Sequence, residues 1–121
     1  MCLITSKPAK IAEKPIIVYK VLLLLSPKIY RTPYQATVVM IDDTLRASVD
    51  TEPYEIYGDY EIKGEGVHAY TSKECAKETY LPYNVITEWE IPAGAKYWEG
   101  TGGCEGEIAA TEMKFIKVCE D

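Results

Sequence analysis

Two stretches of the chain have clear hydrophobic patterns. Residues 16–25 are apolar or aromatic except at Lys20, which is typical of a central strand buried on both faces. Residues 85–91 alternate instead, as a strand with two different faces does. One face carries Val85, Thr87 and Trp89, and the other carries Ile86, Glu88 and Glu90.

Weaker patterns predict four shorter strands, at residues 36–41, 67–70, 95–98 and 113–118. The sequence Thr71-x-x-Glu74 has the form of a capping box and predicts a helix over about residues 72–80. Residues 1–15 resemble an extended lead-in, and 42–63 an irregular or hairpin segment. Six strands and one packed helix predict a single α+β domain over residues 1–121, with a mainly antiparallel sheet.

Composition adds a charge asymmetry to this picture. The chain has 121 residues, enough for one domain, and a net charge of −6. Residues 1–40 hold six basic and one acidic side chain (6 − 1 = +5), whereas the remainder holds seven and eighteen (7 − 18 = −11). The basic part can attract an anionic ligand, or only the acidic part of the same chain. Duplex nucleic acid is a poor partner for so acidic a chain.

The four cysteines, Cys2, Cys75, Cys104 and Cys119, have no metal-ligand spacing, so no metal site is expected. The N-terminus lacks the layout of a signal peptide, and no apolar run approaches the roughly 20 residues of a membrane span. These features predict a cytoplasmic protein with reduced thiols and no membrane contact.

A candidate ligand site surrounds the one histidine of the chain. His68 and Tyr70 share a strand face, and the Thr71 and Ser72 hydroxyls at a helix start can hold an anion. Lys20 and Arg31 would add positive charge. The alternatives are a structural histidine within the sheet and hydroxyls that only cap the helix.

Two further groups have a chemical and a structural interpretation. Glu88 and Glu90 lie about 7 Å apart on one strand face, where one can serve as an acid or base or both can form a solvated outer surface. The glycine-rich residues 100–106 are followed by Glu107-Ile108, not by the Lys-Ser/Thr of a Walker loop, so a hairpin loop is expected.

The order of Val18-Tyr19-Lys20, Ala69-Tyr70-Thr71-Ser72 and Glu88-Trp89-Glu90 with the Pro92-Ala93-Gly94 turn resembles the ADP-ribosyltransferase pattern. The resemblance implies an NAD-dependent enzyme. Lys20 would stand at the arginine position, Thr71-Ser72 at the Ser-Thr-Ser strand and Glu88 at the catalytic glutamate. Lysine lacks the bidentate fork of arginine, which is a departure from that family.

A second resemblance covers more of the chain. Met1-Cys2-Leu3-Ile4-Thr5, Thr32-Pro33-Tyr34, the Gly-x-His-Ala-Tyr stretch and the turn at residues 91–97 look like small uncharacterised proteins of phages and gut bacteria. It implies a host-directed binding role. The leading hypothesis is therefore a non-enzymatic binding protein without a cofactor, which sequesters a small anionic or nucleotide-like ligand or blocks a host protein. The alternatives are the NAD-dependent enzyme and a homo-oligomer with a tyrosine-rich interface.

Overall fold

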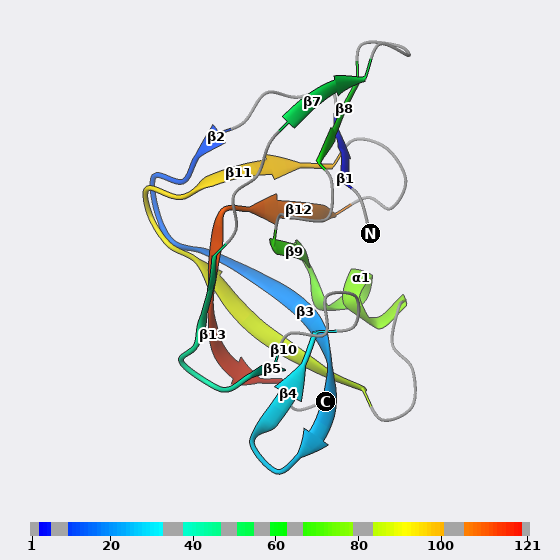
Figure 1. Ribbon diagram of the computed structural model, residues 1–121, viewed down its shortest axis with the longest axis vertical. Coiled ribbons are helices and arrows are strands. Elements are labelled where there is room, and N and C mark those ends of the chain that lie inside the picture. The colour runs from blue at the N-terminus through cyan, green and yellow to red at the C-terminus, as the bar shows by residue number, and fades with distance from the viewer. Residues whose placement is uncertain are drawn as a thin grey trace.

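The computed structural model describes residues 3–5, 10–32, 38–46, 51–54, 59–62, 67–78, 84–100 and 106–119. These residues form thirteen strands and one short helix (Figure 1). The elements are β1 (Leu3–Thr5), β2 (Lys10–Ile11), β3 (Ile16–Ser26), β4 (Ile29–Arg31), β5 (Val38–Val39), β6 (Thr44–Arg46), β7 (Thr51–Tyr54), β8 (Asp59–Ile62), β9 (Val67–Tyr70), α1 (Lys73–Glu78), β10 (Asn84–Ile91), β11 (Lys96–Glu99), β12 (Glu107–Ala110) and β13 (Glu112–Val118).

Ten of these strands belong to one antiparallel sheet. Its order is β2-β11-β12-β9-β3-β10-β13-β6, with β4 paired to β3 and β5 paired to β4. The other three strands form a small sheet in the order β1-β8-β7. The long strands β3 and β10 pair along eight residues, from Ile16 opposite Ile91 to Leu23 opposite Asn84.

The predicted α+β class with six strands is wrong. The described chain is a mostly β structure, and its single helix has only six residues, Lys73–Glu78. The additional strands are two to four residues long and lie partly in segments 1–15 and 42–63. Segments this short carry no readable hydrophobic period, and they are extended because an antiparallel neighbour supplies their hydrogen bonds.

The main core lies on one face of the large sheet. Its centre is Trp89, whose ring stacks on Phe115 with ring centroids 4.9 Å apart, while Tyr30 meets Phe115 edge-on at 5.4 Å. Val18 and Val39 are buried beside them. Aromatic pairs at these separations add stability beyond the area that they bury.

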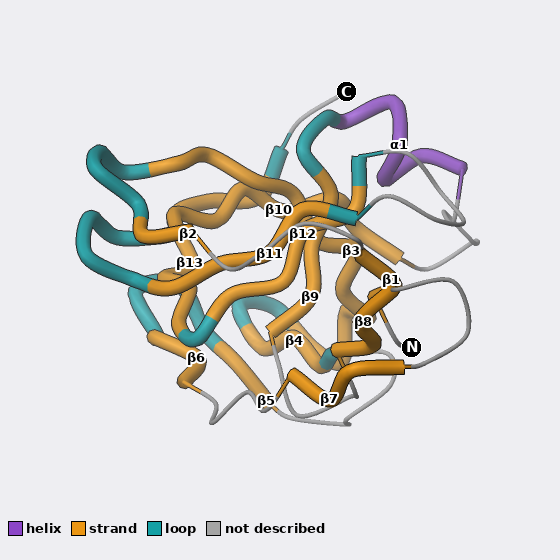
Figure 2. The backbone as a smooth tube through the Cα atoms, turned by 90° about the horizontal axis from the view of Figure 1, so that it is seen from above, coloured by secondary structure: helices purple, strands orange, loops and turns teal. Residues whose placement is uncertain are grey.

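A smaller core lies on the opposite face, under the helix. Val21, Tyr70, Ala76 and Ile86 form it. Figure 2 shows α1 on one side of β3 and β10, and β4 and β5 on the other. The two faces of β3 are therefore covered by different elements, and this decides where each candidate site residue points.

Candidate functional site

Lys20 is partly buried on one face of the large sheet. It is opposite Thr87 in the β3–β10 register, and cross-strand partners share a sheet face, so Lys20 faces the main core. Its ammonium donates a hydrogen bond to the backbone carbonyl of His68 and lies 6.0 Å from the centre of the Trp89 ring. The carbonyl is available because β3 and β9 pair only at Tyr19 and Tyr70.

Burial changes the protonation of both polar residues at this point. Loss of hydration lowers the pKa of Lys20 from 10.5 to about 8. Burial, together with the positive charge of Lys20, lowers the pKa of His68 to about 4. The imidazole is therefore neutral at pH 7, and its buried Nε2 has no hydrogen-bond partner. The Lys20 ammonium, which stays mostly protonated at pH 7, is engaged by the His68 carbonyl.

The next three candidate residues serve the junction between β9 and α1. Tyr70 is opposite Tyr19 and is buried in the smaller core. The Thr71 amide donates to the carbonyl of Gly106 at 2.7 Å. The Ser72 hydroxyl accepts a hydrogen bond from the amide of Cys75 at 3.2 Å, which caps the helix. These contacts correspond to the capping alternative.

Glu88 lies on the other side of the sheet from Lys20. Its cross-strand partners are Tyr19 on β3 and Lys117 on β13, whereas Lys20 is opposite Thr87. Because successive strand residues point to opposite faces, the Glu88 carboxylate and the Lys20 ammonium do not converge. The ADP-ribosyltransferase-like hypothesis requires that convergence.

Arg31 occupies a third place. It lies on β4, where its cross-strand neighbours are Leu23 on β3 and Val38 on β5. Leu23 is three residues beyond Lys20, so the two basic residues are about 10 Å apart along the sheet and on opposite faces. Within the described chain, the Arg31 guanidinium has no ion pair, and its buried Nε has no hydrogen-bond partner.

Exposed apolar residues that the sequence patterns did not indicate lie on the strand of Arg31, on the two strands that pair with it and on the residues next to these strands. Their surface is formed by the end of β3, by β4 and β5, and by the two residues after β5, at the lower end of the molecule in Figure 1. We call this surface the apolar tip, and its members are Leu24, Leu25, Ile29, Val38, Met40 and Ile41. Leu25, Val38 and Met40 each keep more than half of their surface exposed, at 52%, 56% and 51%. The hydrophobicity of residues 16–25 predicts burial on both faces, but Ile17 is exposed and the last residues of the run extend past the core.

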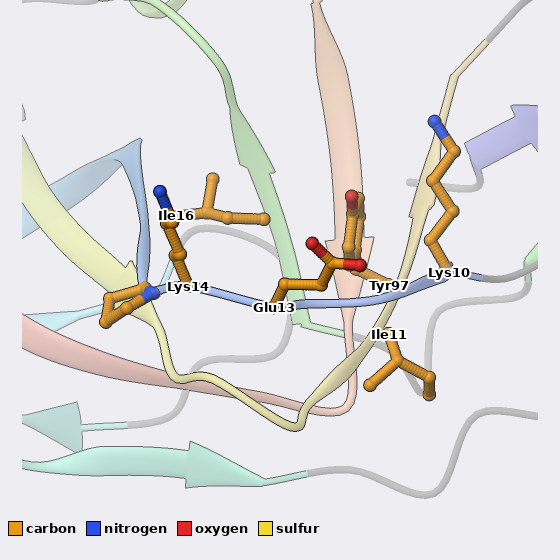
Figure 3. A pocket seen from close by; sticks show the side chains of 7 residues that line it. Lys10, Ile11, Glu13, Lys14, Ile16 and Tyr97 are labelled. Atoms are coloured by element: carbon orange, nitrogen blue, oxygen red, sulfur yellow. The ribbon is translucent and has the colours of Figure 1, made fainter.

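An open pocket of about 760 Å³ lies at the other end of β3 (Figure 3). It is lined by Lys10, Ile11, Glu13, Lys14, Pro15, Ile16 and Tyr97. Figure 3 shows the Glu13 side chain between those of Lys10 and Lys14. Lys10 also forms an ion pair with Glu99 at 3.3 Å. An anion in this pocket would meet a carboxylate as well as the lysines, so the charge pattern does not select for anions.

Among the described residues, no group of three or more histidine, cysteine, aspartate or glutamate side chains could hold a metal ion. Cys2, Cys104 and the loop at 101–105 lie outside those residues. No helix of the described chain is long and apolar enough to cross a membrane. No family model, curated protein or solved structure matches the chain.

Proposed function

We propose that the protein is a non-enzymatic binding protein that docks another protein on the apolar tip. The observation that carries this proposal is the concentration of six exposed apolar side chains on adjacent segments of one ribbon. Large contiguous exposed apolar surfaces are uncommon on monomeric proteins, and they often mark interaction sites.

One face of the two-stranded ribbon of β4 and β5 packs on the main core. Tyr30 and Val39 are opposite each other in the register and point into the main core, where both are buried. Their neighbours Ile29, Val38 and Met40 therefore point outward. The ribbon is apolar on both faces, although the core needs only one of them.

The segment that follows β5 is held in place by three hydrogen bonds. The Asp42 amide donates to the carbonyl of Phe115, and the Phe115 amide donates to the carbonyl of Asp43, both at 2.9 Å. The Asp43 carboxylate accepts from the amide of Met40 at 2.8 Å. A surface held in this way loses little conformational entropy when it binds a partner.

Most of the other expected ligand residues make contacts that stabilise the fold and do not lie at this tip. The Lys20 ammonium bonds to the backbone carbonyl of His68, and Ser72 caps α1. Arg31 is the member of that set that lies among the exposed apolar side chains. A host protein as the partner follows from the resemblance to phage and gut-bacterial proteins. A cytosolic location belongs to the same proposal.

Selection of short peptides from a displayed random library tests the proposal. The tip variant Val38→Thr/Met40→Gln keeps similar side-chain sizes but makes both positions polar. The control variant Ile11→Thr/Ile17→Thr makes the same kind of change at two exposed apolar residues outside the tip, on β2 and β3. We expect peptides enriched on the wild type to bind the control equally and the tip variant at least tenfold more weakly. Equal binding to all three proteins would refute the proposal.

A further inference from the structure

We infer that Arg31 is the specificity-determining residue of the apolar tip, and that the partner is an apolar protein segment carrying a carboxylate that pairs with it. This inference rests on the proposed function and names the chemistry of the partner. It starts from the observation that the tip holds a cation in its middle strand.

The surroundings of Arg31 are aliphatic on both sides. Its cross-strand neighbours are Leu23 and Val38, and Ile29 is two residues away on the same face of β4. The stem of the arginine lies against these strands, because its Nε is buried while the residue as a whole stays partly exposed. The Arg31 side chain therefore lies beside Ile29 and Val38, the tip residues on its own face of the ribbon.

The guanidinium also has unused hydrogen-bonding capacity. Of its five N–H donors, the Nε–H is buried without an acceptor, and no carboxylate of the described chain pairs with the group. The other ion pairs of the described residues, such as Arg46 with Glu112 at 3.5 Å, lie elsewhere on the sheet. The buried Nε–H is out of a partner's reach, but the outer Nη–H groups are not buried without a partner, and they can hold a partner's carboxylate in a bidentate geometry.

Charge complementarity favours an acidic protein segment over an anionic membrane. With a net charge of −6 the chain is repelled by an anionic lipid surface, and a single arginine gives little compensation. A carboxylate flanked by apolar side chains needs only the one cation. Once the flanking side chains exclude water, salt screens the pair only weakly.

The test is a double-mutant cycle on a peptide enriched by the wild type in the library selection. We expect such peptides to combine apolar residues with an Asp or Glu. Changing that acid to its amide should weaken binding to the wild type about tenfold and leave binding to Arg31→Gln unchanged. Arg31→Lys, which keeps the charge but not the fork, should lose a few-fold in affinity. Thermal unfolding verifies that each variant is folded.

Three results would overturn the inference, and they differ in what they say of the proposed function. If the acid-to-amide change weakens binding equally on wild type and Arg31→Gln, Arg31 does not read the carboxylate, yet the tip stays the docking site. If Val38→Thr/Met40→Gln binds as well as the wild type, both proposals fail. If no peptide is enriched while vesicles of phosphatidylglycerol bind the wild type and not the tip variant, the partner is a lipid surface and both proposals fail.

Discussion

The ammonium of Lys20 and the backbone carbonyl of His68 are joined by a hydrogen bond inside the sheet. It links β3 and β9 where their backbones do not pair, since the two strands share only the pair Tyr19–Tyr70. Two residues with the chemistry of a ligand site thus have a structural role. Their protonation can be read from the stability of the protein.

The first prediction concerns Lys20. Its pKa of about 8 in the folded protein is below the usual 10.5, so between these values the unfolded chain binds more protons than the folded one. The free energy of unfolding should therefore rise with pH across this window, by up to about 3 kcal/mol. In Lys20→Met this contribution is absent. Urea unfolding at pH 7, 8, 9 and 10 should show the difference between the two proteins changing with pH, and a constant difference would contradict a buried ammonium.

The second prediction concerns His68. Because its pKa in the folded protein is about 4, below the usual 6.5, the wild type should lose stability as the pH falls from 6.5 towards 4. We expect a loss of up to about 2 kcal/mol, allowing for the partial exposure of the ring, and a smaller loss in His68→Gln. The imidazole proton signals of the one histidine should not titrate between pH 8 and 5.5 in the NMR spectrum. A midpoint near 6.5 would show that the ring is solvated.

The third prediction separates crowding from backbone strain at two glycines. Gly94 and Gly106 have nearly the same φ, +90° and +89°, but a side chain at Gly94 would meet nothing within 4 Å. A Cβ at Gly106 would lie 2.8 Å from the Cys75 Sγ and 3.0 Å from the Thr71 Oγ1. Gly94→Ala should cost about 1 kcal/mol from strain alone, and Gly106→Ala about 1–3 kcal/mol more. Cys75→Ala should restore part of the additional loss, and an equal cost at both glycines would exclude the close contact.

The fourth prediction concerns the polar group in the main core. The buried Thr87 hydroxyl accepts from the indole Nε1 of Trp89 at 2.7 Å and donates to the Lys20 carbonyl at 2.8 Å. Thr87→Val has nearly the same shape but leaves the indole N–H unsatisfied, so it should lower the free energy of unfolding by about 1–3 kcal/mol. Thr87→Ser, which keeps the hydroxyl, should lose only about 1 kcal/mol for the methyl group. If Thr87→Ser lost more stability than Thr87→Val, packing of the methyl group and not the hydrogen bond would account for the loss.

The long strands could be predicted from the sequence because each carries its own pattern. The ranges 16–25, 85–91 and 113–118 correspond to β3, β10 and β13 within one residue at each end. The short strand β6 could not be predicted, because Thr44–Arg46 is held in place by its pairing with Glu112–Lys114. Its extended form depends on a partner far away in the chain.

The candidate site residues were harder to place for a related reason. Lys20 is the one charge in an apolar run, and only its register opposite Thr87 determines that it points inward. Leu25 has the same hydrophobicity as Leu22, but Leu22 is fully buried and Leu25 is half exposed. The difference depends on how far the core extends along β3, which is a property of the assembled sheet.

The affinity of one enriched peptide, measured by isothermal titration calorimetry, tests the docking function of the apolar tip most directly. Three proteins are compared: the wild type, Val38→Thr/Met40→Gln and the control Ile11→Thr/Ile17→Thr. We expect the Kd of the tip variant to be at least tenfold higher than that of the wild type, and the Kd of the control to lie within twofold of it. The same Kd for the tip variant and the wild type would contradict this docking function.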